Sequence, residues 1–470
     1  MTGTTGDRLR TCARGPHDDV TPGPRPGTAA ARPFLLAVVI AAASLMTAPA
    51  PAPAQDVAFE TVIAGLKSPD PSVRIRSLVL LRQAGYLEAA PALAPLLADP
   101  DPTVQGAAVE TVLGLYLVDA NYTWAFGKSL IKEKGATLAL FAFVQGPGAT
   151  IANPVSPEVI RGLVLATGSI TPAVRFDAAY SLAVLGRPLA RQGRLPDANA
   201  VLDGLIAILR ESNSVMKQAA TNALGRLLGA ANDSGSPGGD LASIRVEAGD
   251  LIVGGLNEAD LDLRLASMGA LGEMRYERAV QSLTDLFNYH KKGPEAMAAL
   301  DAVAKIGHPG SLPVLLAQLG HRDAQVRRLA IEGIARTGDP ASMAQMKAKM
   351  DGDQSAYVGH ALAFAKARTG DFSEMAKLVQ GFRYSSLEAD TFSYLVELGA
   401  AAAGELGAFS THGDTKVRTG VAEVLGIVGD QTSLGLVDVL MRDRNKQVAA
   451  AAARSHKRLV PRVSAAGRVP

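Results

Sequence analysis

The residue types that most often do chemistry are few in this sequence and lie far apart. Residues 55–470 contain six histidines and no cysteine, because the single cysteine is Cys12. No histidine is followed by glutamate, and none belongs to a His-x-x-x-His pair, so the helical zinc-site pattern is missing. His308 and His321, thirteen positions apart, could approach each other in short loops. We interpret them as solvated loop residues rather than as metal ligands.

Ser214 and Lys217 match the Ser-x-x-Lys spacing of some acyl-transfer enzymes, in which the serine is a nucleophile. No companion motif accompanies them, and Val215 falls on a position that a repeat, described below, reserves for a buried valine. The Gly-rich segment 229–240 contains no lysine, so it does not indicate a phosphate-binding loop. We expect a mobile surface loop there. No catalytic residue, metal or cofactor is predicted, and we expect a protein that is not an enzyme.

Aromatic residues gather in one irregular stretch, 119–170. Tyr122, Trp124 and Phe126 lie close together, and Trp124 is the only tryptophan. This stretch is either a degenerate repeat with an enlarged loop or a projection that binds a partner, since insertions on one face of a repeat array often form a binding surface. We therefore predict Tyr122, Trp124 and Phe126 as partner-binding residues.

A capped helix that begins at Asp323 is the element around which the rest of the chain is organised. Asp323 is a residue type that accepts an unpaired backbone N–H at a helix N-terminus. Val326, Ala330 and Ile334 follow at the i, i+4, i+8 spacing of a buried stripe. Gly338 is expected to end the helix, because glycine adopts the left-handed conformation without a Cβ penalty.

The same construction, a capping residue three positions before an apolar residue, recurs along the chain. The pairs are Asp70/Val73, Asp101/Val104, Thr171/Val174, Ser212/Val215, Asp260/Leu263, Asp323/Val326, Ser355/Val358, Asp414/Val417 and Asn445/Val448. We predict that each apolar member is buried. Glycines twelve positions later, which we expect to end helices, are Gly85, Gly186, Gly338, Gly370 and Gly429. Paired helices that recur at the short spacing from Val73 to Val104 are typical of a solenoid.

Arginine follows the valine or leucine in several copies, at Arg74, Arg175, Arg264, Arg327 and Arg418. The segments 70–74, 323–327 and 414–418 resemble HEAT repeats, and the resemblance extends over residues 56–460. The short period is similar to that of the HEAT-like repeats of phycobilisome lyases. The resemblance implies an all-α, right-handed α-solenoid of about eleven to twelve helix pairs. It also implies that the arginines form a ladder between repeats, and that the protein is a scaffold binding a protein or peptide on its concave face.

Two families of enzymes contain related repeats. Deoxyhypusine hydroxylases use repeated His-Glu dipeptides as iron ligands, and no His-Glu dipeptide occurs here. A bilin lyase needs a pocket with dedicated acid and base residues, and no pattern identifies them. A lyase, or a metal- or cofactor-dependent enzyme with a pocket near 119–170, remains the alternative to a scaffold.

The charge of the chain gives no sign of a nucleic-acid partner. Lysine and arginine total 47, aspartate and glutamate total 45, and the segment 1–54 contains five of the arginines and three of the aspartates. Without this segment, basic and acidic side chains are equal in number, whereas nucleic-acid binding requires a basic surface. Apolar residues make up 48% but aromatic residues only 5%, which suits thin helical layers built from Ala, Leu and Val.

The segment 1–54 resembles an export signal. Arg32 precedes the apolar run 34–46, and small residues then lead to Ala52-x-Ala54, which predicts cleavage before Gln55. The run is shorter than the roughly 20 residues that cross a bilayer, so no membrane span is expected after cleavage. We expect a periplasmic or extracellular protein. A structural envelope component, anchored to the membrane by an uncleaved leader, remains the alternative.

The expected organisation follows from these patterns. Its segments are a leader (1–54), HEAT-like repeats (55–118), a degenerate repeat with an insertion (119–170), further repeats (171–460) and a disordered tail (461–470). The spacing from Val104 to Val174 is more than twice that from Val73 to Val104, so it leaves room for two repeats and a surplus. Arg454, Lys457 and Arg458 are expected to form a polar end cap, or alternatively a patch for an acidic partner. The sequence does not indicate an oligomeric state.

Overall fold

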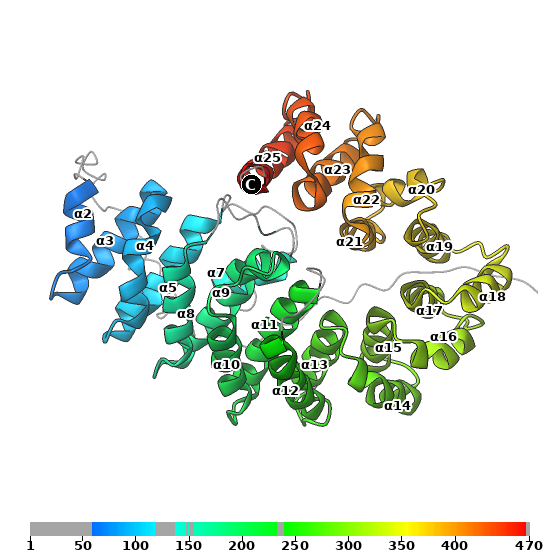
Figure 1. Ribbon diagram of the computed structural model, residues 1–470, viewed down its shortest axis with the longest axis horizontal. Coiled ribbons are helices and arrows are strands. Elements are labelled where there is room, and N and C mark those ends of the chain that lie inside the picture. The colour runs from blue at the N-terminus through cyan, green and yellow to red at the C-terminus, as the bar shows by residue number, and fades with distance from the viewer. Residues whose placement is uncertain (1–58, 118–136, 147–148, 150–154, 233–238, 467–470) are drawn as a thin grey trace, which may run out of the picture. The chain divides into compact units, whose positions relative to one another are not determined.

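The structure, a computed structural model, describes residues 59–466 apart from 118–136, 147–148, 150–154 and 233–238 (Figure 1). The capped helices, including two degenerate members, α15 and α21, are α3 (Pro71–Ala84), α5 (Pro102–Tyr116), α9 (Pro172–Arg191), α11 (Ser214–Asn232), α13 (Leu261–Glu273), α15 (Pro294–Ile306), α17 (Ala324–Thr337), α19 (Ala356–Arg368), α21 (Glu388–Leu398), α23 (Thr415–Val428) and α25 (Lys446–Ala466). The partner helices are α2 (Phe59–Gly65), α4 (Ala90–Leu93) with η1 (Leu87–Ala89) and η2 (Ala94–Ala98), α8 (Pro157–Thr167), α10 (Ala198–Leu209), α12 (Gly239–Gly255), α14 (Val280–His290) with η4 (Glu277–Ala279), α16 (Leu312–Gln318) with η5 (Pro309–Ser311), α18 (Pro340–Met350), α20 (Met375–Gln380) with η6 (Gly381–Arg383), α22 (Ala400–Leu406) with η7 (Gly407–Phe409), and α24 (Gln431–Met441).

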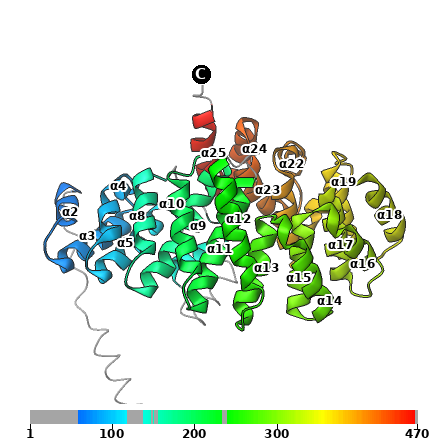
Figure 2. The same cartoon turned by 60° about the horizontal axis from the view of Figure 1, so that its bottom comes forward.

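The helices stack in two layers. In one layer, each capped helix packs on the next, from α3 on α5 through to α17 on α19, and again α23 on α25. In the other layer, α8 packs on α10, α10 on α12, and α16 on α18. Figure 2 shows the paired helices from a second direction. Leu, Val and Ala side chains between the layers form the core, as expected of an α-solenoid.

The predicted caps begin most of the capped helices. Side chains accept a backbone N–H of the first turn at Asp70, Asp101, Asp260, Asp323, Asp414 and Asn445. Thr171 and Ser355 stand at the cap position with extended backbone but without such a bond. Proline occupies the first helical position in α3, α5 and α9, where its missing N–H has no intrahelical partner to lose.

The apolar residue three positions after the cap is buried in most repeats. Those less than 6% exposed are Val104, Val174, Leu263, Val326, Val358, Val417 and Val448. Val73, in contrast, is 39% exposed, so its predicted burial is wrong. Elsewhere this side chain packs on the preceding capped helix, as Val174 packs near Gly106 of α5. No capped helix precedes α3 in the described part of the chain.

The register of α11 differs from the prediction by one residue. Asn213 is the cap instead of Ser212, and its Oδ1 accepts the N–H of Met216 at 3.1 Å. Met216 is therefore buried, while Val215 is 54% exposed, so the predicted pair Ser212/Val215 is wrong. Serine and asparagine are both favoured caps, and the packing of Met216 decides between them.

The predicted helix-ending glycines fall into two groups. Gly85, Gly338 and Gly370 have positive φ at or just after helix ends, as predicted. Gly186 instead lies inside α9, where a Cβ would come within 3.0 Å of Leu227, so the glycine permits close packing. Gly429 has a φ of −65° and ends α23 with extended backbone.

Residues 118–156 separate two consecutive repeats. α5 packs directly on α9, and the Ser169 hydroxyl donates to Gln105 Oε1 at 2.6 Å. This hydrogen bond connects the first turn of α5 to the segment just before α9, and ion pairs make the same connection between other repeats. Val104 to Val174 is thus one repeat with an insertion, where the spacing predicts two repeats and a surplus. α8, within the segment predicted to be degenerate, is the ordinary partner helix of α9. One additional helix, α7 (Leu138–Val144), packs on α9 and α5.

Two predicted irregular segments contain regular helix. α11 continues through 229–232, where the sequence predicts a loop, and α25 continues to Ala466 inside the predicted tail. Residues 239 and 240 of that loop begin α12, and residues 233–238 and 467–470 lie outside the described residues. Across the described part of the chain, no helix combines the length and the apolar character needed to cross a bilayer.

Candidate helix-docking site

An ion-pair ladder connects consecutive repeats. The residue four positions after the cap donates to a carboxylate at the approach to, or in the first turn of, the next capped helix. The pairs are Arg74–Asp99 (2.8 Å), Arg175–Glu211 (2.8 Å), Lys217–Glu258 (2.6 Å), Arg264–Glu295 (2.7 Å), Arg327–Asp353 (2.8 Å) and Arg418–Asp443 (2.6 Å). Arg327 also donates to the carbonyl of His321 at 2.7 Å, so one guanidinium fixes two successive turns. The predicted ladder is confirmed.

A second recurring position accounts for His321 and His412. Two residues before the cap stands a side chain that accepts the cap's backbone N–H, at Ser68, Asp99, Ser169, His321, Asp353, His412 and Asp443. His308 likewise accepts the N–H of Gly310 at 3.0 Å. These histidines stabilise turns. Within the described ranges, no group of three or more His, Cys, Asp or Glu could hold a metal ion.

The Ser-x-x-Lys motif is also part of the repeat. Ser214 is the first residue of α11, and Lys217 is the ladder residue that pairs with Glu258. The Lys217 ammonium thus donates to the next repeat, and no hydrogen bond between Lys217 and Ser214 is found among the described residues. The motif therefore has a structural explanation.

Five of the capped helices share one further stripe, made of the residues five, nine and thirteen positions after the cap, because residues four apart share a helix face. We call this the docking stripe. It consists of Phe176, Tyr180 and Val184 on α9; Gln218, Asn222 and Arg226 on α11; Leu265, Gly269 and Glu273 on α13; Arg328, Glu332 and Arg336 on α17; and His360, Phe364 and Arg368 on α19. Two helices of the chain, α7 and α21, contact these stripes.

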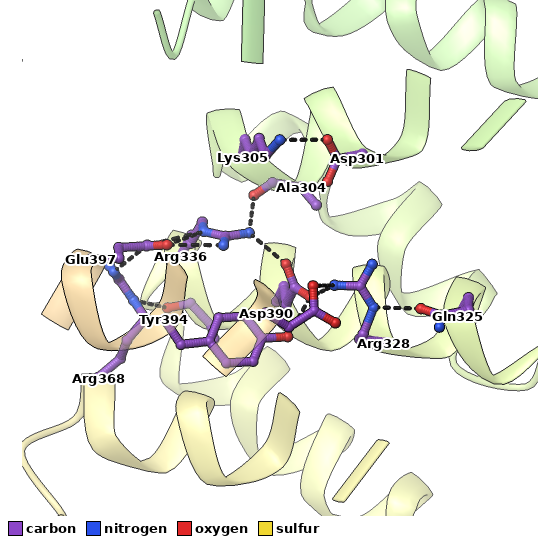
Figure 3. A network of polar contacts seen from close by, with 12 residues as sticks. Asp301, Ala304, Lys305, Gln325, Arg328, Arg336, Arg368, Asp390, Tyr394 and Glu397 are labelled. Atoms are coloured by element: carbon purple, nitrogen blue, oxygen red, sulfur yellow. Dashed lines mark hydrogen bonds and ion pairs between the residues drawn. The ribbon is translucent and has the colours of Figure 1, made fainter. Parts of the chain in front are cut away.

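Ion pairs at both ends hold α21 on the stripe of α17 (Figure 3). Arg336 donates to both oxygens of Glu397, at 3.0 and 2.9 Å, and Arg328 lies 3.2 Å from Asp390. Burial would raise the pKa of Glu397, but Arg336 and Arg368 outweigh it and keep that pKa below its usual value. The carboxylate is therefore charged at neutral pH, which this buried geometry requires.

Glu332 joins the two ends of this contact. Its carboxylate accepts from Arg328 at 2.6 Å, from Arg336 at 3.2 Å and from the Tyr394 hydroxyl at 2.5 Å. Its side chain is 3% exposed, so these donors replace the water that the carboxylate has lost. Burial, reinforced by the Glu332 charge, raises the pKa of Tyr394 well above its usual value. Tyr394 therefore remains a donor.

The stripe of α19 contacts the same face of α21. Phe364 stacks on Tyr394 with ring centroids 4.2 Å apart, and His360 Nε2 lies 3.0 Å from the Thr391 hydroxyl oxygen. Burial, followed by the positive charge of Arg328, lowers the pKa of His360 to about 4. His360 is thus neutral at physiological pH. Perturbed pKa values often mark active sites, but here each follows from the packing of α21.

A shorter and wholly apolar helix, α7, contacts the stripes of α9 and α11. The rings of Phe143 and Tyr180 lie 4.8 Å apart. The Arg226 guanidinium lies 4.3 Å from the centre of the Phe143 ring and donates to the Phe143 carbonyl at 3.4 Å. This is a cation–π contact, which gains strength where water is displaced. Charged and apolar helices are therefore both accommodated by docking stripes.

On α13, between these two helices, no described residue covers the middle of the stripe. A Cβ at Gly269 would meet no atom of the described residues within 4 Å, and Leu265 is half-buried. Glu273 is exposed and pairs with Arg226 at 3.2 Å. An apolar residue and a glycine with space above it thus lie between stripes that already hold helices.

Some of the predicted residues are found at their expected positions, and others lie outside the described part of the chain. Asp70, Arg74, Asp323, Val326, Arg327, Asp414, Val417 and Arg418 occupy the predicted cap, core and ladder positions. Tyr122, Trp124 and Phe126 lie outside the described residues. The docking stripes were not predicted. Their signal was the i, i+4, i+8 series Arg328, Glu332, Arg336 opposite the charged residues of 390–397.

Comparison with known proteins identifies HEAT repeats in two parts of the chain. The family model of HEAT repeats matches residues 59–116 and 292–365. No curated protein matches. Similar solved structures include an engineered protein (16% identity, TM-score 0.38, 85% of this chain and 98% of that one). They also include yeast importin-beta, Kap95p (12%, 0.38, 91% and 70%) and the complex of CpcE and CpcF of phycocyanin lyase from Nostoc sp. PCC7120 (16%, 0.29, 64% and 98%). The family model of HEAT repeats thus matches two parts of this α-solenoid, and capped helices with ladder pairs also occur between and beyond them.

Proposed function

We propose that this protein is an exported, non-enzymatic scaffold that binds a protein or peptide partner on its concave face, and that the docking stripes line that face. One observation supports this proposal above all. The additional helix α7, and the capped helix α21 that follows α19 in the array, both contact docking stripes of other capped helices, so the surface has the chemistry to accept helices. A preformed surface loses little conformational entropy on binding.

The open stripe on α13 is the place where a partner would extend this contact. Gly269 leaves space for a side chain of the ligand, and Leu265 supplies apolar area. The neighbouring Asp301 and Lys305 on α15 pair with each other at 2.6 Å, which leaves little net charge. We therefore expect the partner to present an apolar or mixed helix or peptide, not a strongly charged one.

Affinity capture from the native periplasm or medium tests this proposal. The decisive variant is Gly269→Glu, which places a charged side chain in open space without a clash. The matched control is Gly435→Glu on partner helix α24, where a Cβ also meets no atom within 4 Å. Both proteins should melt at or above the wild-type temperature, because glycine inside a helix costs roughly 1 kcal/mol relative to alanine.

The variants should differ in binding. Capture of a specific partner by the wild type and by Gly435→Glu, but not by Gly269→Glu, supports the proposal. Equal capture by all three proteins places the partner elsewhere. Partner-binding roles for Tyr122, Trp124 and Phe126 belong to the same proposal, and replacing all three by alanine should weaken capture without changing the melting temperature.

Export is a separate part of the proposal and has its own test. Protein recovered from the periplasm or medium should begin at Gln55 on N-terminal sequencing. An intact leader in the membrane fraction would instead favour the anchored envelope component.

A further inference from the structure

The helix α7 packs on both α5 and α9, but it makes neither of the contacts that join these two helices to each other. α5 and α9 pack on each other directly, and Gln105 and Ser169 close their junction at 2.6 Å. α8 supplies the partner helix of α9. The contact between α5 and α9 is thus complete without α7. The helix α7 instead covers the docking stripes of α9 and α11.

The helix α7 is apolar on every side, and Ala139 and Ala142 belong to the core. Its sequence, LALFAFV, has no polar residue, and Ala139, Phe141 and Ala142 are at most 3% exposed. Isolated helices shorter than about 12 residues are unstable in water. A helix as short as α7 therefore depends on the surface beneath it, chiefly on α9.

The surface under α7 has a charged residue near each end of the helix. Near its start, the carboxyl of Asp177 on α9 forms a hydrogen bond with the side chain of the cap residue, Thr137, while burial raises the pKa of this carboxyl. In its last turn, Arg226 of α11 donates to the Phe143 carbonyl and lies over the Phe143 ring. Negative charge at a helix N-terminus and positive charge at its C-terminus both stabilise the helix dipole. The site therefore selects a direction as well as an apolar sequence.

Between these charges, the site is aromatic. Tyr180 is buried and contacts Phe143, and Phe176 packs edge-on against Tyr180 at 4.9 Å. The Tyr180 hydroxyl accepts from Asn222 of α11 at 3.1 Å, which fixes the ring. Aromatic pairs in this geometry add about 0.5–1.5 kcal/mol beyond the area they bury. A ligand helix would need an aromatic residue where α7 has Phe143.

We infer that the surface formed by Tyr180, Asp177 and Arg226 is a binding site for a short, apolar helix of a partner protein, with an aromatic residue in its last turn, and that α7 occupies this site as an internal competitor. The inference rests on the proposed function in that it names the chemistry of the partner's binding element. The partner helix displaces α7 and binds in the same direction.

The test uses the mature chain with residues 138–144 replaced by a Gly and Ser segment of the same length. The probe is a fluorescein-labelled peptide of residues 137–146 with a hydrophilic tag. The altered chain should bind this peptide at least tenfold more tightly than the wild type, because α7 no longer competes. A peptide of the same residues in reverse order should bind at least tenfold more weakly than the forward peptide.

Side-chain variants locate the site. In the altered chain, Arg226→Ala should weaken peptide binding about tenfold, consistent with the loss of a cation–π contact and a hydrogen bond. Arg454→Ala is the matched control, since Arg454 lies on another capped helix, α25, and pairs with Glu423 at 2.9 Å, as Arg226 pairs with Glu273. If the replacement unfolds the chain, Phe141→Asp provides a second way to release α7.

Three results would overturn the inference. One is a folded chain without α7 that does not bind the peptide. The second is equal binding of the forward and reversed peptides. The third is a concentration-dependent dimer of the wild type that disappears when α7 is replaced, which would make a second copy the occupant. The peptide assay needs no natural partner, so its failure is distinguishable from a failure to capture one.

Discussion

The hydroxyl of Tyr394 donates to the carboxylate of Glu332 at 2.5 Å, although the two residues are 62 positions apart and both are buried. This bond, together with two arginines on the same stripe, joins α17 to α21 across the intervening α19. A buried carboxylate with three donors is stable only while all three remain in place.

Removing one donor should therefore be measurable. Tyr394→Phe keeps the ring that stacks on Phe364 but leaves Glu332 without its hydroxyl, and we expect a loss of about 1–3 kcal/mol in the free energy of unfolding. Urea unfolding followed by circular dichroism measures it. Tyr384→Phe, at a tyrosine that is 54% exposed, is the control and should change little. Equal stability of both variants would show that α21 does not depend on this bond.

Aspartate substitutions test the repeat register. Val326→Asp buries an unpaired charge in the core and should cost several kcal/mol. Val215→Asp should cost well under about 1 kcal/mol, because that side chain is exposed and Met216 occupies the core position. Melting temperatures of both variants distinguish the two positions. A large loss for Val215→Asp would restore Ser212 as the cap of α11.

Two glycine-to-alanine substitutions should have opposite signs. A Cβ at Gly225 of α11 would lie 2.7 Å from the Cα of Ala270 on α13, so Gly225→Ala should separate these helices and destabilise the protein by about 1–3 kcal/mol. Gly269→Ala, at an open helix-interior site, should stabilise it by up to about 1 kcal/mol. Chemical denaturation measures both. The same sign for both would indicate a different packing of α11 on α13.

The stability of the protein should depend on pH through His360. Its pKa is lowered from 6.5 to about 4 in the folded protein, so below pH 6.5 the unfolded chain binds more protons than the folded one. Stability should fall as the pH falls from about 6.5 to about 4, by up to about 3 kcal/mol if His360 dominates. Unfolding free energies measured across this window, for the wild type and His360→Gln, give the result. An unchanged slope in the variant would assign the pH dependence to other groups.

The repeat itself was readable from the sequence because its signals are local. Asp323, Val326 and Arg327 lie within one helical turn, and their roles as cap, core residue and ladder residue depend on that spacing. The pattern did not identify the cap where two adjacent residues are both favoured at a helix N-terminus. Ser212 and Asn213 both suit a cap, and only the packing of Met216 on other helices selects Asn213.

The docking contacts could not be derived in the same way, because their partners are distant in sequence. Arg336 and Glu397 are 61 positions apart, and Arg226 and Phe143 are 83 apart. Nothing in the spacing of Arg328, Glu332 and Arg336 indicated that another helix would cover them. Pairings of this kind follow from the tertiary arrangement of the repeats.

The junction between Gln105 and Ser169 spans 64 positions of the chain, whereas that between Arg327 and Asp353 spans 26. Both junctions are made by atoms at helix ends, so the repeat spacing does not depend on the length of the connecting chain. Lengthening a flexible loop twofold costs only about 0.6 kcal/mol of closure entropy. We therefore expect the connection between α5 and α8 to tolerate the insertion of a reporter or a whole domain without a change in the spacing of the repeats.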